Sequence, residues 1–444
     1  MHKSVWEENF KLPHFESLSG EEKCDVLIIG GGICGILCAH LLQESGFSCI
    51  IAEGKRIASG TTGNTTAKIT SQHGLIYTKL IRAYGREKAK MYLDINERAI
   101  SEYERLGKGA DCDFERRSAY TYSLSDREKI EDEVNAVNTL GHTAEFSQTE
   151  ELPFKTSGAV AFKNQAQFNP LKFISHLAKK LKIYENTFIR DIAPDVAVSD
   201  SGKIRAHKII VATHFPFINK HGSYFLKLYQ HRSYVAAYEN AQKISGMYVD
   251  DDKKGMSFRQ YKNLLLVGGG GHRTGKQGGN WAELREFAKE HYPQAKLRYE
   301  WAAQDCMSLD GVPYIGRYSA KTPDLYVATG FNKWGMTSSM AAAMILRDEL
   351  LDKKNDCAEV FSPQRSILKP QLLVNGFEAT ANLLTPTVKR CPHLGCALKW
   401  NKAERSWDCP CHGSRFEEDG TLIDNPATGD AKGDVKKVQN AKRQ

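Results

Sequence analysis

Four cysteines and two histidines lie close together near the C-terminus, in CPHLGC (391–396) and CPCHGSRF (409–416). Thiolate sulfur and imidazole nitrogen are ligands both for zinc and for iron–sulfur clusters. A zinc finger takes two cysteines from one short motif and two histidines from the next, whereas each stretch here supplies one of each. That mixed pairing favours a cluster of two irons over a zinc site. The candidate ligands are Cys391, His393, Cys409 and His412.

Both stretches resemble the cluster-binding loops of Rieske [2Fe–2S] proteins, with structural zinc as the alternative. The resemblance implies that Cys396 and Cys411 form a disulfide between the loops, and that the Ser414 hydroxyl donates to a cluster sulfur. Phe416 stands where the family often has a tyrosine, so that second hydroxyl donor is missing. The reduction potential is therefore expected within the Rieske range of roughly −150 to +300 mV, but below its top.

A second chemical motif lies near the N-terminus. The apolar run CDVLIIG (24–30) predicts a buried parallel strand, a helical pattern follows, and FSCIIAE (47–53) predicts a second strand ending in an acid. Such a strand–turn–helix–strand unit binds a dinucleotide: the glycines allow close approach of a pyrophosphate, the helix N-terminus attracts it, and the acid accepts ribose hydroxyls. The predicted residues are Gly30, Gly32, Gly35 and Glu53.

Later segments resemble the D-amino-acid oxidase and glycine/sarcosine oxidase family, which binds FAD. They are GKRIASGTTGNTTAKIT (54–70), KIIVATH (208–214), DGVPYIGR (310–317) and DLYVATGFNKWGMTSSMAAAMILRDEL (324–350). In that family the last segment places a helix N-terminus against the flavin, where its dipole stabilises the reduced, anionic ring. The resemblance implies FAD contacts at Arg56, Ser59, Thr61, Thr62, Asn64, Ala212, Thr213, Gly330, Gly335, Met336 and Thr337.

The resemblance also implies the architecture. We expect an α/β Rossmann-like FAD-binding domain with an interleaved α+β antiparallel-sheet substrate domain, followed by a small all-β Rieske domain. The oxidoreductase is expected over residues 1–365 and the Rieske domain over 366–444, joined by a linker in 352–369. Within the first, the FAD-binding parts are about 23–110, 155–218 and 300–352, and the substrate parts about 111–154 and 219–299.

Two features of the middle of the chain bear on this plan. Residues 85–110 predict an amphipathic helix. The glycine run 268–271 follows a strand-like segment but precedes HRTGKQGGN instead of a helix, so we expect no second dinucleotide site and no direct use of NAD(P)H. Only about 20 residues, 370–390, precede the first cluster loop, so the Rieske domain is either abbreviated and supported by the flavin domain or borrows base strands from elsewhere.

Arg259, His272 and Arg273 are the candidate catalytic or substrate-binding residues on the expected roof over the flavin. A guanidinium there could bind a substrate carboxylate, and an ordinary surface ion pair is the alternative. Sarcosine oxidases carry a lysine where Thr337 stands, and Lys333 is displaced from that position. Cys306 is expected to be a buried thiol, not a covalent flavin attachment.

Composition sets the cellular context. The chain has 444 residues, 41% hydrophobic and 26% charged, with a net charge of +8. No run reaches the roughly 18 apolar residues of a membrane span, and the N-terminus lacks a secretory signal, so a cytoplasmic location is expected. The basic C-terminal tail is interpreted as a solvated segment, not a nucleic-acid-binding arm. Its cations are Lys432, Lys436, Lys437, Lys442 and Arg443.

Together the two motifs predict an electron-transfer enzyme. A flavin accepts two electrons as a hydride, and a [2Fe–2S] cluster carries one at a time. We expect a dehydrogenase that oxidises the C–N bond of an amine or amino acid, as the family resemblance implies, and passes electrons from FAD to the cluster and then to an external protein or quinone. Three alternatives stay open: a reductase fed by the cluster, an amine oxidase whose cluster is structural or redox-sensing, and a non-catalytic or RNA-modifying role suggested by the basic tail.

Overall fold

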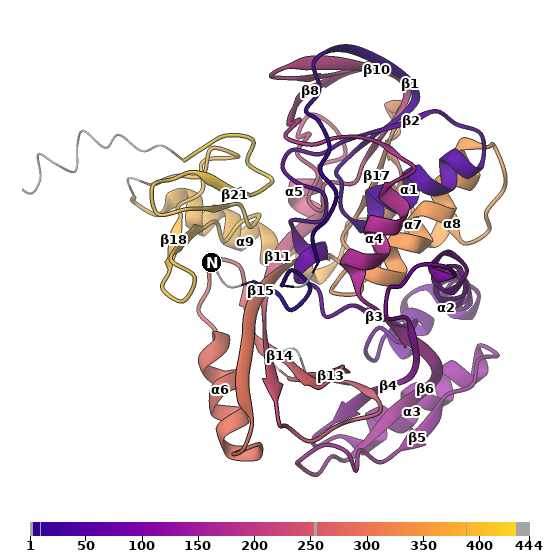
Figure 1. The fold of residues 1–444 in the computed structure, drawn as a ribbon, viewed down its shortest axis with the longest axis vertical. Helices are drawn as coiled ribbons and strands as arrows, with labels where there is room; N and C mark the ends of the chain where they lie inside the picture. Colours follow the sequence, from indigo (N-terminus) through magenta and orange to yellow (C-terminus); the bar gives the residue numbers. More distant parts are fainter. Residues whose placement is uncertain (1–2, 9, 253–254, 388, 432–444) are drawn as a thin grey trace, which may run out of the picture.

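The computed structural model describes residues 3–8, 10–252, 255–387 and 389–431, and its described strands form three sheets (Figure 1). The basic tail and its interpretation lie outside the described residues. Among the helices that are described, none is long and apolar enough to cross a membrane.

The first sheet has the parallel core expected of a dinucleotide-binding fold. β1, β2, β7, β10 and β17 run parallel, and helices α1 and α7 pack against each other over it. The central strand ends are apolar on both faces, because helices and loops cover both. In sheet order the strands are β16 (Tyr314–Ser319), β17 (Thr322–Thr329), β10 (Gly202–Val211), β1 (Gly20–Ile29), β2 (Cys49–Ala52) and β7 (Lys182–Tyr184). In addition, β9 (Val196–Ser199) pairs with β10, and β8 (Ile189–Ala193) pairs with β9. The helices of this part are α1 (Ile33–Glu44), α4 (Pro170–Ala178), α7 (Gly335–Leu350) and α8 (Ala358–Phe361).

The second sheet is mixed and mostly antiparallel. Its order is β15 (Lys296–Ser308), β11 (Leu228–Glu239), β14 (Leu264–Arg273), β13 (Ser257–Tyr261), β12 (Met247–Asp250), β4 (Glu115–Ser123), β6 (Gly158–Gln167) and β3 (Lys68–Ile69), with β5 (Glu145–Ser147) beside β6. Its helices are α2 (Tyr77–Gly107), α3 (Arg127–Thr139), α5 (Tyr224–Lys227) and α6 (Asn280–His291). The helix predicted over 85–110 is the longer part of α2, which bends at Gly85 (φ 82°).

The sheet topology differs in three places from the expected domain ranges. β3, β6 and most of β15 were expected within the FAD-binding parts, yet all three belong to the second sheet. β6 pairs along β4, and β15 pairs along nearly all of β11. Strand partners so distant in sequence are chosen by tertiary pairing, which local patterns do not reveal. The glycine run 268–271 lies inside β14 and does not open a helix.

The C-terminal part is a helix followed by a four-stranded antiparallel sheet. The segment 370–390 was expected to be too short for the usual base strands of a Rieske domain. Most of it forms helix α9 (Pro370–Leu384), which has proline in its first turn. The sheet comprises β18 (Lys399–Asn401), β19 (Ser406–Asp408), β20 (Arg415–Phe416) and β21 (Leu422–Asp424). Figure 1 shows this gold part at one side of the molecule, near α5 and β11. The domain is thus abbreviated and supported by the flavin domain.

The segment expected to be a linker is firmly attached to the flavin domain. Arg365 donates to both carboxylate oxygens of Asp310 at 2.8 Å, and Tyr84 donates to the same carboxylate. Burial alone would raise the pKa of Asp310, but the Arg365 hydrogen bonds and charge keep it lowered. The linker therefore fixes where α9 begins.

Candidate cofactor sites

The glycine turn after β1 is dictated by close backbone packing. Gly30 has φ +112°, and a Cβ there would lie 2.5 Å from the carbonyl oxygen of Ala212 at the end of β10. A Cβ at Gly35 would lie 1.9 Å from the Gly30 carbonyl oxygen. Only glycine allows this turn to bring strand ends and helix together, as the dinucleotide motif requires.

The N-terminus of α1 suits a phosphate group. Its N-cap residue, Gly32, has no side chain to cap the helix, and the first turn carries no acid. The Thr62 hydroxyl accepts from the Ile33 N–H at 3.1 Å. At the end of β2, Glu53 accepts from the N–H groups of Gly31 and Lys55 at 2.7 and 2.8 Å. These residues fit the diphosphate and ribose of FAD.

The other residues predicted in the Thr-rich loop mainly shape it. The Ser59 hydroxyl donates to the Arg56 carbonyl, Thr61 to the Gln304 carbonyl, and the Asn64 side chain to the Gly60 carbonyl. Arg56 pairs with buried Glu185, with Nε to Oε2 at 2.9 Å. Their contacts with FAD stay a prediction.

The turn before α7 has the second set of predicted FAD contacts. Gly330, Asn332 and Lys333 all have positive φ, so the chain reverses tightly into the helix. The first turn of α7 contains Gly335, Met336 and Thr337 and carries no acid. This uncharged helix start suits an electron-rich flavin edge.

A buried aromatic group beside this turn was missed from the sequence. His73 stacks on Trp334 with ring centroids 5.0 Å apart, and its Nε2 lies 2.9 Å from the Thr337 hydroxyl. Its Nδ1 lies 2.6 Å from the Tyr92 hydroxyl, and burial lowers its pKa to about 3. His73 is therefore a neutral group that holds the α7 turn. No spacing signal joins it to Thr337, because 264 positions separate them.

The four predicted cluster ligands converge between the two C-terminal loops. The imidazole rings of His393 and His412 lie 4.9 Å apart, and Cys391 and Cys409 interact through their side chains. Within the described part of the chain, the buried Nδ1 atoms of both histidines have no hydrogen-bond partner. Burial lowers the pKa of His393 to about 4 and of His412 to about 3, so both rings are neutral. Two free imidazole nitrogens beside two thiols are the donor set of a Rieske cluster.

The surroundings of this donor set complete the resemblance. Cys396 and Cys411 form a disulfide that joins the two loops. Ser414 Oγ accepts from the Ala427 N–H at 2.9 Å and interacts with Cys391, so its own hydrogen is free to point at that sulfur. Phe416 is buried in the core of the small domain. Oxidised in a disulfide, Cys396 and Cys411 are not ligands although their sulfurs lie within 4.8 Å of that of Cys409.

The histidine end of this site faces the flavin domain. His393 Nε2 lies 3.0 Å from Asn219 Oδ1, and the Phe225 backbone hydrogen-bonds to His412. The Phe215 ring contacts both imidazoles, with centroids 6.5 and 6.2 Å away. All three partners follow β10, the strand whose end carries the predicted FAD residues Ala212 and Thr213. None of them could be identified from sequence spacing.

Polar contacts fix the two domains together around the cluster loops. Gln230 and Gln304 donate to the carbonyls of His412 and Gly413 at 3.0 and 2.9 Å, and Asn425 donates to the carbonyls of Thr213 and Phe215 at 2.7 Å.

A buried ion-pair network lies in the same interface. Glu404 accepts from Arg232 of β11 and from Arg415 of β20. Burial would raise the pKa of Glu404, but these two guanidinium groups hold it at about 2.

The three candidate substrate residues are dispersed. Arg259 is fully buried and donates to the carbonyls of Thr66, Ala67 and Phe168. His272 bonds to Tyr234 and to the Arg273 carbonyl. Arg273 bonds to the C-terminal part, at the carbonyls of Pro410 and Cys411 and at Asn375 Oδ1. The structure does not bring the three together, and their role in substrate binding stays a prediction.

Cys306 is a buried free thiol 3.6 Å from the Thr329 hydroxyl, and burial raises its pKa to about 12.

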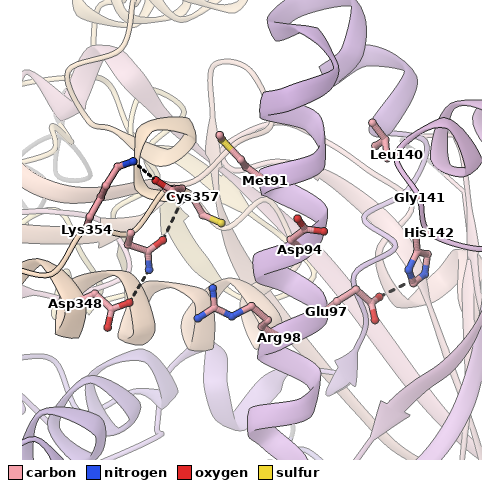
Figure 2. Close-up of a pocket in the computed structure, with 12 residues that line it drawn as sticks. Met91, Asp94, Glu97, Arg98, Leu140, Gly141, His142, Asp348, Lys354 and Cys357 are labelled. Atoms are coloured by element: carbon pink, nitrogen blue, oxygen red, sulfur yellow. Dashed lines mark hydrogen bonds and ion pairs between the residues drawn. The ribbon is translucent and has the colours of Figure 1, made fainter.

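A separate cavity of about 650 Å³ lies between α2 and the segment after α7 (Figure 2). Its lining mixes acids and bases, among them Asp94, Arg98 and Asp348. None of the residues predicted for FAD or the cluster lines it.

Comparison with known proteins agrees with this geometry. A sequence model described as FAD dependent oxidoreductase matches residues 25–349, and one described as Rieske [2Fe-2S] domain matches residues 369–439. The chain is 33% identical to a putative Rieske 2Fe-2S iron-sulfur protein, YhfW, of Bacillus subtilis, covering 96% of each chain. It is 22% identical to gamma-glutamylputrescine oxidoreductase of Escherichia coli over 77% of this chain and 86% of that protein.

Solved structures show the same fold. Glycine oxidase from Geobacillus kaustophilus superposes with a TM-score of 0.65 at 19% identity, covering 78% of this chain and all of that one. L-Proline dehydrogenase from P. horikoshii superposes with a TM-score of 0.66 at 16% identity, covering 78% of this chain and 98% of that one. The chain belongs to the FAD-dependent oxidoreductase family and carries a C-terminal Rieske domain. It is an FAD-dependent oxidoreductase whose two domains bind FAD and a [2Fe–2S] cluster, as predicted.

Proposed function

We propose that this protein is a dehydrogenase that oxidises the C–N bond of an amine or amino acid and passes the electrons to an external acceptor, a protein or a quinone. When bound, FAD accepts a hydride from the substrate and the [2Fe–2S] cluster carries electrons singly. We also propose a cytoplasmic location for this activity.

The observation that carries the proposal is the position of the histidine end of the cluster site. Phe215 contacts both imidazoles and lies two residues beyond Thr213, a predicted FAD contact. Thr213 Oγ1 donates to the Phe215 carbonyl at 2.9 Å. A short covalent and hydrogen-bonded link therefore joins the histidine end of the cluster site to this predicted FAD contact. A cluster used only as a structural staple would need no such contact.

The substrate class is supported by charge near the α7 turn and by the relatives. Burial lowers the pKa of Lys333 and raises that of Asp305, and the two groups interact electrostatically. Because burial disfavours both charges, the carboxylate and ammonium groups of a bound amino acid would supply the counter-charges that stabilise them. The names of several relatives, glycine oxidase, L-proline dehydrogenase and gamma-glutamylputrescine oxidoreductase, point to the same class.

The test is anaerobic mixing of the holoenzyme with a panel of amines and amino acids. We expect one substrate to bleach the flavin absorbance, followed by the low-temperature EPR signal of a reduced histidine-ligated cluster. The oxidase alternative would be established by two results together. The flavin of the wild type would bleach without the EPR signal of a reduced cluster, and a Cys409→Ser variant would form peroxide in air at the full rate. A cluster that reduces the flavin from an external donor, with no response to any amine, would establish the reductase.

A further inference from the structure

Helix α9 carries its apolar side chains on the outside. Among the residues that the structure describes, ten large apolar side chains are exposed, and seven of them lie between positions 368 and 394. Leu373, Phe377 and Leu384 are 78%, 74% and 76% exposed, at a spacing that places them along one helix face. We call the following set the apolar patch: Leu368, Leu373, Val374, Phe377, Leu383, Leu384 and Leu394. Patches of this kind mark contact surfaces.

The inner side of α9 is polar and fixed. Asn375 and Asn382 are its buried residues. Asn375 Oδ1 accepts from Arg273 at 3.0 Å, and the Asn382 carbonyl accepts from the Ala397 N–H at 3.0 Å. The helix therefore has a defined rotation in the folded protein, and the apolar patch is a permanent surface feature.

The apolar patch is joined to the cluster loop. Arg390 donates to the carbonyl of Leu383 in α9 and to that of Gly395 in the loop at 391–396, at 3.2 and 2.8 Å. Leu394, a member of the patch, follows the ligand His393 directly. Whatever binds the patch is thus brought against the outer side of the cluster loop.

The charges around α9 are positive. Lys369 lies at its N-cap, and Lys389 and Arg390 follow its C-terminus. The single acid of the helix, Glu378, is only 15% exposed and pairs with Lys276 at 2.7 Å. In the sequence, positions 432–444 add four lysines and one arginine against one aspartate. An apolar helix face flanked by cations is the composition of an interfacial helix on anionic lipid.

We propose that α9 docks this enzyme on the surface of an anionic lipid bilayer, with the apolar patch inserted among the lipids and the flanking cations on the headgroups. Two other occupants fit less well. The sequence at 432–444 has two valines and no larger apolar residue, so its composition offers little apolar surface to match the patch. A second copy would bring the same cations face to face, which opposes pairing.

The test is co-sedimentation of the holoprotein with vesicles of phosphatidylcholine and phosphatidylglycerol in a 3:1 ratio. We expect binding that weakens in high salt and with phosphatidylcholine alone, because the cations contribute through screened attraction. A Leu373→Ser/Phe377→Ser variant should bind the vesicles at least about tenfold more weakly than the wild type, since two large apolar side chains no longer insert.

A Leu124→Ser/Leu297→Ser variant is the matched control, because both leucines are exposed outside the apolar patch; it should bind as the wild type does. No binding to the 3:1 vesicles, or equal binding by the patch variant, would overturn the proposal. So would a dimer that the patch variant dissociates, since a second copy would then be the occupant. The assay uses no substrate, so it is independent of whether an amine is oxidised.

Discussion

Asn219 of the flavin domain accepts a hydrogen bond from His393, a predicted cluster ligand: its Oδ1 lies 3.0 Å from His393 Nε2. Because the inner Nδ1 of His393 is the atom available for iron, Nε2 carries the ring proton and donates it in this bond. The contact therefore fixes the orientation of the His393 ring, and it joins the flavin domain to the Rieske domain at a predicted cluster ligand. It acts through His393, which makes Asn219 a positioning residue.

Asn219→Leu removes this acceptor while keeping the branched shape of the side chain. We expect electrons from the substrate to reach the cluster about tenfold more slowly, because the ligand ring is no longer held. Rapid-freeze EPR after anaerobic mixing measures this rate, and iron content should not change. Asn263→Leu, at an exposed site, is the control; an unchanged rate in Asn219→Leu would exclude this contact from the electron path.

Glu404→Gln leaves two buried guanidinium groups without their shared carboxylate. We expect the free energy of unfolding at pH 7 to fall by about 3 kcal/mol, the usual cost of breaking a buried ion pair from one side. Glu418→Gln tests an exposed pair with Arg405 and should cost less than about 1 kcal/mol. Urea unfolding of both variants gives the comparison, and equal small losses would contradict a central role for Glu404.

Acid should weaken the same interface. The folded-state pKa of Glu404 is about 2, below its ordinary value of 4.5, so its contribution to stability is complete above pH 4.5. As the pH falls from 4.5 toward 2 that contribution is lost, because the unfolded chain takes up the proton first. The stability difference between wild type and Glu404→Gln should therefore shrink over this range, and a constant difference would refute the assignment.

Cys409→Ser should abolish the cluster while FAD stays bound. The wild type is expected to contain about two irons per chain and to give the EPR signal of a reduced Rieske centre. The variant lacks one thiolate ligand, so iron analysis should return a small fraction of that value, with flavin absorbance retained. Cys306→Ser, which changes a buried thiol in the flavin domain, should keep its iron. Zinc in the purified wild type would instead support the structural alternative.

Ser414→Ala should lower the reduction potential of the cluster. The hydroxyl stabilises the reduced form by donating to a ligand sulfur, and alanine removes that donor without removing a ligand. A redox titration followed by EPR measures the shift, with the wild type expected between roughly −150 and +300 mV. A wild-type value near −400 mV, as in plant-type ferredoxins, would exclude a Rieske centre.

The parts of the site that the sequence predicted are those built from local motifs. The glycine turn at Gly30, the acid at Glu53 and the two cluster loops each lie within a short stretch, where residue type and spacing carry the chemistry. The sequence placed β6 and most of β15 in the FAD-binding parts, whereas both belong to the second sheet. The sheet to which a strand belongs is set by partner strands elsewhere in the chain, which local motifs do not reveal. The bond between Arg273 and the C-terminal part could not be predicted from the sequence, since the direction of this side chain depends on where that part packs.

The sequence by itself determined the two cofactors and the family, because short motifs fix the backbone turns and donor atoms that FAD and a [2Fe–2S] cluster need. Only the tertiary structure decided that the histidine end of the cluster faces Asn219, Phe215 and Phe225, and that α9 points its apolar side outward. These relationships join residues more than 150 positions apart or depend on how a helix is rotated against its neighbours. Packing and buried hydrogen bonds set both, and no local pattern records them.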